Sequence, residues 1–278
     1  YSHLKDPKTE GVRVAVALAV LKLLLLMPQR VLKAELHGFL MRVVQTVSSR
    51  NKVLRQQGRE ALAKVVLELG APNFGAVLHE LKTSLTKGYQ IHVLGYTVHY
   101  LLSKLVPTLQ PGDLDYCARP LVKVLLADLF GEAAEKKEVE EIATSMKEAR
   151  ATRSFASFEL LASAIQFVPN INLLVPPLHE AVLAAPGGVD SLKNIGIVRD
   201  VLRHAALGLG ANRSVEIQPL CVYVRGMLIT HLPPKPTGAA AGGGGNERAA
   251  PVGSVRQPIT EAGVTSGSGR NPLAHELL

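Results

Sequence analysis

The chain has 278 residues, 47% of them apolar but only 4% aromatic, with no Trp and a net charge of +8. At this length it can bury a substantial core, which must be built from Leu, Val and Ala, as in packed helices. The two cysteines, Cys117 and Cys221, lie far apart and exclude a disulfide framework or a cysteine metal site. We expect both to be reduced thiols in the core.

The first half of the chain shows apolar residues at helical spacing. This spacing predicts six helices, over residues 10–27, 30–48, 51–69, 73–86, 89–106 and 114–130. Pro28, Gly70 and Pro107 follow three of them, as expected at helix ends. The apolar run 12–27 is interrupted by Lys22 and is shorter than the ~20 residues of a membrane span, so we interpret it as a buried helix.

Residues 132–150 differ in kind, because charged side chains lie on nearly all sides of any helix they form. We expect an exposed linking helix or an insertion there. Apolar helical patterns resume over residues 154–168, 177–185, 190–208 and 215–231. Residues 232–278 are rich in Gly, Ala, Pro and Ser, a composition that predicts a disordered tail. Helical-repeat segments are therefore expected over residues 1–131 and 151–231.

The predicted fold is all-α, with about ten helices paired by short turns. Helix pairs that recur every ~40 residues are typical of HEAT and armadillo repeats, which stack into an α-solenoid. Because no repeat matches a sharp consensus, a compact all-helical bundle is the alternative.

The basic excess lies in the first half of the chain. Residues 1–131 contain 17 Lys and Arg against 9 Asp and Glu, an excess equal to the net charge of the whole chain. A basic segment favours contact with polyanions such as RNA. On charge alone, however, an ordinary solvated surface with an excess of lysine is the better explanation. If the hairpins stack, a basic ridge could form. Its candidate phosphate contacts are Arg42, Arg50, Lys52, Arg55, Arg59, Lys82 and Lys87.

Three ring side chains, His92, Tyr96 and His99, fall on one face of the helix predicted over residues 89–106. His92 and His99 are two turns, or ~10 Å, apart, too far for one metal ion with bonds of ~2 Å. We expect this stripe to face a partner or the next repeat, and a structural, hydrogen-bonded role is the favoured interpretation for each His. The sequence contains no Walker loop, dinucleotide fingerprint or nucleophile elbow. We therefore expect no enzyme activity, no cofactor and no metal site.

The most specific motif covers residues 87–99, Lys-Gly-Tyr-Gln-Ile-His-Val-Leu-Gly-Tyr-Thr-Val-His. Its distinctive residues are Gly88, Tyr89, Gln90, His92, Tyr96 and His99. With its flanks, over about residues 55–126, this motif resembles the component 20 family of the U3 small nucleolar ribonucleoprotein. Residues 155–162 resemble the same family more weakly. Since family members are very large and this chain starts at Tyr1, we interpret it as an internal fragment.

The resemblance implies a non-catalytic HEAT-repeat scaffold of the small-subunit processome, or 90S preribosome, in the nucleolus of the nucleus. Such a scaffold would support pre-rRNA processing toward 18S rRNA and assembly of the small ribosomal subunit. The implied partners are processome proteins, U3 RNA, pre-rRNA and the remainder of the parent polypeptide, with no membrane and no small-molecule substrate. The alternative is a HEAT-type adaptor for another protein or a transport cargo, unconnected with pre-ribosomes.

Overall fold

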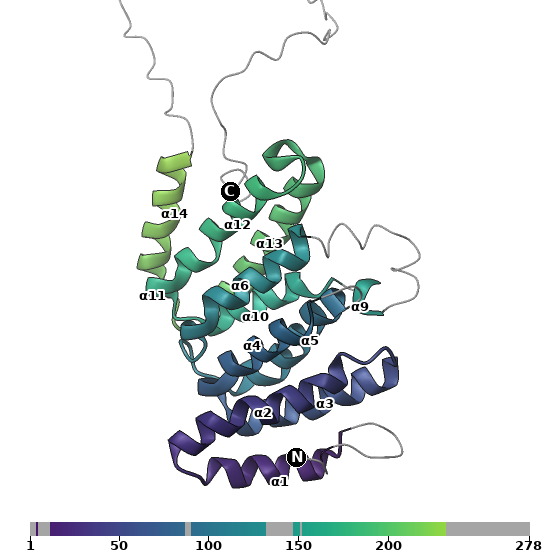
Figure 1. The fold of residues 1–278 in the computed structure, drawn as a ribbon. Helices are drawn as coiled ribbons and strands as arrows, with labels where there is room; N and C mark the ends of the chain where they lie inside the picture. Colours follow the sequence, from purple (N-terminus) through teal and green to yellow (C-terminus); the bar gives the residue numbers. More distant parts are fainter. Residues whose placement is uncertain (1–3, 5–11, 87–89, 132–146, 151, 232–278) are drawn as a thin grey trace, which may run out of the picture. The chain divides into compact units, whose positions relative to one another are not determined.

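The computed structural model describes residues 4, 12–86, 90–131, 147–150 and 152–231, which contain helices and no β-strand (Figure 1). The prediction of an all-α fold is confirmed. The chain divides into two compact units, Tyr1–Leu220 and Cys221–Leu278. The predicted tail over residues 232–278 lies outside the described residues.

The predicted helices are present, with small shifts at their ends. The helices are α1 Val14–Leu25, α2 Gln29–Val47, α3 Lys52–Leu69, α4 Phe74–Ser84, α5 Gln90–Leu105, α6 Asp115–Phe130, α9 Lys147–Arg150, α10 Ser154–Ala164, α11 Phe167–Asn170, α12 Val175–Ala184, α13 Leu192–Ala211 and α14 Ile217–His231. Gly70 ends α3 with a φ of 70°, a conformation that glycine adopts without steric cost. A helix predicted over residues 154–168 stops at Ala164, whose carbonyl accepts a hydrogen bond from the Gly112 N–H.

Within residues 1–220 the long helices pack in two rows (Figure 1). The first row consists of α2, α4, α6 and α12, each in contact with the next. The second row consists of α1, α3, α5, α10 and α13, again each in contact with the next. Helices on both sides of the segment 132–150 share these rows, because α10 packs against α5 and α6.

The core is aliphatic, as the composition predicts. Leu40, Val43, Leu62 and Leu101 are among many fully or almost fully buried side chains on both rows. Within the described ranges, the fully buried aromatic side chains are Phe39, Phe74, Phe158 and Phe167. Burial of each large apolar side chain stabilises the fold by about 1.5–3 kcal/mol. Packing between the rows therefore outweighs the weak intrinsic preference of any single helix.

Two expectations about burial are wrong. Cys117 is buried as predicted, but Cys221 is exposed. Its apolar neighbour Val222 is exposed as well, so apolar sequence surroundings were a poor guide to burial in α14. The helix predicted to be buried near the start of the chain, α1, buries one face only, because Leu23 and Leu25 are exposed while Ala17 and Leu21 are buried.

Among the described helices, none is by itself long and apolar enough to cross a bilayer. Residues Lys52–Leu69 and Ala71–Ser84 meet the length and composition criteria only as a pair. The two members of that pair are bent by 118° relative to each other.

Candidate nucleic-acid interface

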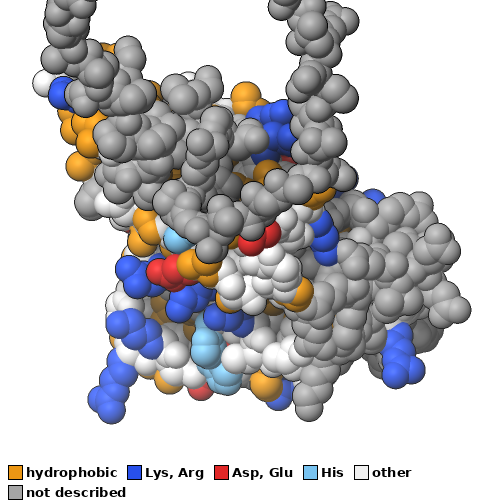
Figure 2. All heavy atoms as spheres, turned by 90° about the horizontal axis from the view of Figure 1, so that it is seen from above, with side chains coloured by type: hydrophobic (Ala, Val, Ile, Leu, Met, Phe, Trp, Pro, Cys, Tyr) orange, Lys and Arg blue, Asp and Glu red, His pale blue; other side chains and the backbone are white. Residues whose placement is uncertain are grey.

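The predicted phosphate contacts separate into exposed and buried groups. Arg42, Arg50, Lys52 and Lys82 are exposed. Arg55 and Arg59 are only 4% and 2% exposed. Lys87 lies outside the described residues. On the face drawn in Figure 2, Lys and Arg side chains gather with His side chains toward the lower left, with hydrophobic side chains among them.

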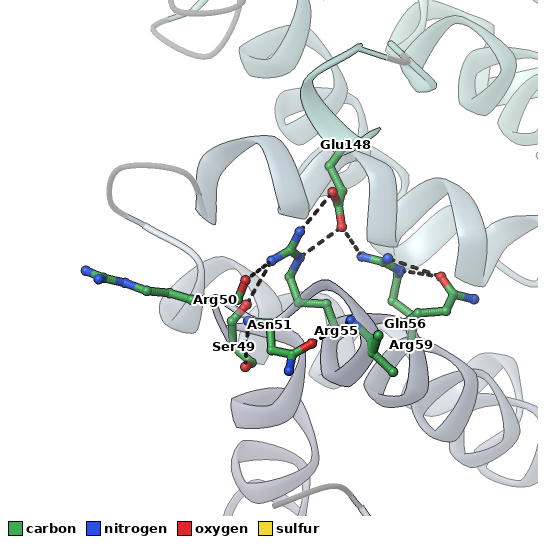
Figure 3. A network of polar contacts seen from close by, with 8 residues as sticks. Ser49, Arg50, Asn51, Arg55, Gln56, Arg59 and Glu148 are labelled. Atoms are coloured by element: carbon green, nitrogen blue, oxygen red, sulfur yellow. Dashed lines mark hydrogen bonds and ion pairs between the residues drawn. The ribbon is translucent and has the colours of Figure 1, made fainter. Parts of the chain in front are cut away.

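Arg55 lies at the centre of a buried polar network that joins α3 to α9 (Figure 3). Its Nε and Nη2 donate to the two carboxylate oxygens of Glu148, at 2.9 and 3.1 Å. Its Nη1 donates to the carbonyls of Ser49 and Arg50, at 3.1 and 2.8 Å. The guanidinium therefore caps the turn between α2 and α3 while it binds a carboxylate bidentately, the stronger geometry for this pair.

Arg59 binds the same carboxylate from one turn further along α3. Its Nη1 donates to Glu148 Oε1 at 2.9 Å. Its Nε and Nη2 both donate to the side-chain oxygen of Gln56, at 3.3 and 3.1 Å. The guanidinium carbon lies 4.9 Å from the ring centroid of Tyr96, and Lys147 Nζ lies 5.9 Å from the same centroid. Cation–π attraction thus adds to the ion pair and links α9 to α5.

Glu148 is the anion that makes burial of two arginines tolerable. Burial opposes its ionisation, but hydrogen bonds from Arg55 and Arg59 lower its pKa to about 2. Glu148 is itself buried, so the expectation of an exposed helix over residues 132–150 is wrong at this position. Arg55 and Arg59 are therefore not accessible to phosphate, because both are buried and bound to a carboxylate. Residues 132–146 lie outside the described residues.

Three of the described motif residues, His92, Tyr96 and His99, lie between helices. His92 is 1% exposed, so it does not lie on an exposed partner-facing surface. Gln90 begins α5, and Tyr96 is half-buried beneath Arg59. Nδ1 of half-buried His99 lies 3.2 Å from the hydroxyl of Ser157 on α10. Burial, together with the nearby charge of Arg153, lowers the pKa of His99.

These contacts favour the interpretation in which the stripe faces neighbouring helices of the same chain. Gly88 and Tyr89 lie outside the described residues. No group of three or more His, Cys, Asp or Glu suited to a metal ion occurs within the part of the chain that the structure describes.

A carboxylate that the sequence did not single out explains one glycine of the motif. Asp128 of α6 is buried and accepts a 2.6 Å hydrogen bond from the Ser154 hydroxyl. A Cβ atom at Gly95 would lie 2.8 Å from the carboxyl carbon of Asp128, so a larger residue would displace it. A mainly apolar pocket of about 200 Å³ borders Gly95 and Asp128. Its volume is below the range of about 300–1,000 Å³ that is usual for small-molecule sites.

Comparison with known proteins shows one family. The model of the U3 small nucleolar RNA-associated protein 20 domain matches residues 4–228. The chain is similar to the U3 small nucleolar RNA-associated protein 20 of Schizosaccharomyces pombe, with 31% identity over 223 residues. It is also similar to the Saccharomyces cerevisiae protein of that name, with 31% identity over 219 residues. These matches cover 80% and 79% of the chain, but the chain spans only 9% of either relative's length.

Proposed function

Because this chain belongs to the U3 small nucleolar RNA-associated protein 20 family, we propose that it is a non-catalytic scaffold segment in ribosome biogenesis. The family match over residues 4–228 is the observation that carries this proposal. We place its action in the small-subunit processome of the nucleolus, where it would support U3-dependent processing toward 18S rRNA. Its partners would be processome proteins, U3 RNA, pre-rRNA and further parts of its own polypeptide.

The arrangement of helices supports a scaffolding role. Two rows of mutually packed helices leave long faces exposed on each row. In a HEAT-like solenoid, which we propose for these rows, such faces bind extended partners without a deep pocket. Arg42, Arg50, Lys52 and Lys82 remain proposed phosphate contacts on these faces, since all four are exposed.

A protein-binding adaptor is the second candidate function. It is favoured by the apolar residues at the turn from α1 to α2, where Leu26 is 83% exposed and Leu23 and Met27 are also exposed. Such adjacent apolar side chains suit contact with another protein or another helical hairpin better than contact with RNA.

The experiment that separates these functions is crosslinking and RNA sequencing with the tagged full-length protein that contains this chain. We expect recovery of U3 RNA and the 5′ portion of pre-rRNA above a tag-only control. Absence of enrichment, in cells that are actively making ribosomes, would contradict the scaffold proposal and favour the adaptor.

A further inference from the structure

We propose that the exposed face of α2, α4 and α6 binds single-stranded RNA, an inference that rests on the proposed function and specifies one surface for it. We call this surface the first-row face. Its residues are Arg30, Lys33, Lys82, Tyr116, Arg119 and Lys123, all exposed. Of these residues, only Lys82 is among the phosphate contacts predicted from the sequence. The other five were missed because they become its neighbours only when the helices pack.

Side-chain contacts fix the order of the three helices in this face. His37 of α2 is hydrogen-bonded to Glu80 of α4. The hydroxyl of Tyr116 on α6 accepts a 2.8 Å hydrogen bond from the Gly75 N–H of α4. Helix α4 therefore lies between α2 and α6. With neighbouring helix axes about 8–10 Å apart, the face is about 20 Å across, enough for several consecutive phosphates to contact different helices.

Among the described residues, the cations of this face are not engaged in ion pairs. None of Arg30, Lys33, Lys82, Arg119 and Lys123 forms an ion pair within the described ranges. Lys22 on α1, by contrast, lies 3.6 Å from Glu68 on α3. Cations without partners retain their full attraction for an external polyanion.

The acidic side chains of α2, α4 and α6 are buried, hydrogen-bonded to other residues or on another side of their helix. Glu80 and Asp128 are buried. Asp115 accepts hydrogen bonds from the Gln166 N–H, at 3.1 Å, and the Asn170 side chain, at 2.6 Å. Glu35 is exposed, but it follows Lys33 by two residues and so lies about 200° around the axis of α2. The face consequently has a strong positive excess.

Tyr116 supplies an aromatic surface at a fixed orientation. Its hydroxyl donates to the Ala71 carbonyl at 2.7 Å, in addition to accepting from Gly75. The residue is nevertheless 55% exposed. Burial of the hydroxyl end raises its pKa to about 12, so the group stays neutral and keeps its donor proton. Arg119 and Lys123 follow Tyr116 at the i+3 and i+7 positions and share its side of α6.

This combination favours single-stranded RNA over an acidic protein segment or an RNA duplex. Cations spread over three helices track a phosphate backbone, and an anchored ring offers a platform on which an unpaired base can stack. A duplex presents no unstacked base to such a ring, and an acidic peptide has no base to place on it.

The test uses the full-length protein in cells, ultraviolet crosslinking, and mass spectrometry of peptides that carry a nucleotide. The variant is Lys33→Glu/Lys82→Glu/Lys123→Glu, with one reversal on each of the three helices. The matched control is Lys64→Glu/Lys104→Glu/Arg203→Glu, three exposed reversals of equal total charge on the second row. We expect nucleotide adducts on α2, α4 and α6 peptides to fall about tenfold in the variant. The control should retain them.

The outcomes separate this inference from the proposed function. Suppose that U3 RNA co-purifies with the unsubstituted protein but that its α2, α4 and α6 peptides carry no nucleotide. The proposal that the first-row face binds RNA is then wrong, whereas the scaffold proposal is unaffected. An equal loss of adducts in the control variant would also overturn the face, because bulk charge would then explain the signal. A loss of crosslinks to an acidic protein, with RNA adducts unchanged, would assign the face to that protein instead. If U3 RNA does not co-purify at all, the proposed function fails first.

Discussion

The arginines of α3 and the lysines of the first-row face carry the same charge but have different surroundings. Arg55 and Arg59 are buried and share one carboxylate, that of Glu148. Lys33 and Lys82 are exposed, with no ion pair among the described residues. A count of basic residues along the sequence does not distinguish these two groups. The structure shows that one group holds helices in place and that only the other is accessible to a partner.

The two surroundings imply opposite consequences for substitution. Loss of a partner in a buried ion pair leaves an uncompensated charge in a medium of low polarity, so stability falls. Loss of an exposed, unpaired lysine changes the field outside the protein and leaves the core unaltered. Three of the four predictions below test this contrast, two in the buried network and one on the first-row face. The other one, the third, tests the packing of the second row.

The largest effect is expected for Glu148→Ala, which removes the carboxylate between Arg55 and Arg59. We expect the free energy of opening of α3 to fall by about 3–5 kcal/mol, because two buried cations lose their counterion. Hydrogen exchange of α3 peptides in the full-length protein measures this. Glu180→Ala, at an exposed position of α12, is the control and should change α12 by less than about 0.5 kcal/mol. Similar effects of both changes would show that the buried network is not special.

The second prediction concerns acid. The pKa of Glu148 is lowered from 4.5 to about 2 in the folded state, so its contribution is complete above about pH 4.5. It is lost as pH falls from about 4.5 toward about 2, and its full size is about 3 kcal/mol. Protection factors of α3 amides, which correct for the intrinsic pH dependence of exchange, should decline over this range. In Glu148→Gln they should be low and nearly independent of pH. Parallel declines in both proteins would assign the acid sensitivity to another group.

The third prediction asks how tightly the second row is packed. A Cβ atom at Gly208 of α13 would lie 2.1 Å from the Glu159 carbonyl oxygen of α10, whereas one at Gly210 meets nothing within 4 Å. Gly208→Ala should therefore force the two helices apart and destabilise by about 1–3 kcal/mol. Gly210→Ala should stabilise α13 by up to about 1 kcal/mol, because Ala favours helix. Hydrogen exchange of α13 amides measures both changes in stability. Effects of the same sign would contradict the close approach of α13 to α10 at Gly208.

The helices were predictable from local sequence, whereas the buried network was not. Apolar spacing located α3, and Gly70 marked its end, because both signals act within one or two turns. The pairing of Arg55 with Glu148 joins residues 93 positions apart. Nothing in the local pattern of residues 132–150 indicates which side chain returns to the core.

The motif shows the same limit on a smaller scale. Helical spacing correctly put His92, Tyr96 and His99 on one helix, α5. It could not show that α3, α6, α9 and α10 all pack against that helix. A polar stripe on such a helix lies between neighbours, which explains why His92 is buried. Surface and interior can be distinguished from a helical pattern only when one side of the helix is free.

The smallest effect on stability is expected where the effect on binding is largest. Lys33→Glu/Lys82→Glu/Lys123→Glu should change the opening free energies of α2, α4 and α6 by less than about 0.5 kcal/mol each, because the three side chains are exposed and make no ion pair. Hydrogen exchange of these helices in the full-length protein measures this, in the same preparations used for RNA crosslinking. If hydrogen-exchange protection is unchanged while the nucleotide adducts are lost, these lysines bind RNA and do not stabilise the helices. Broad loss of protection would instead show that the first-row cations are structural, as Arg55 and Arg59 are, and the contrast between the two groups would not hold.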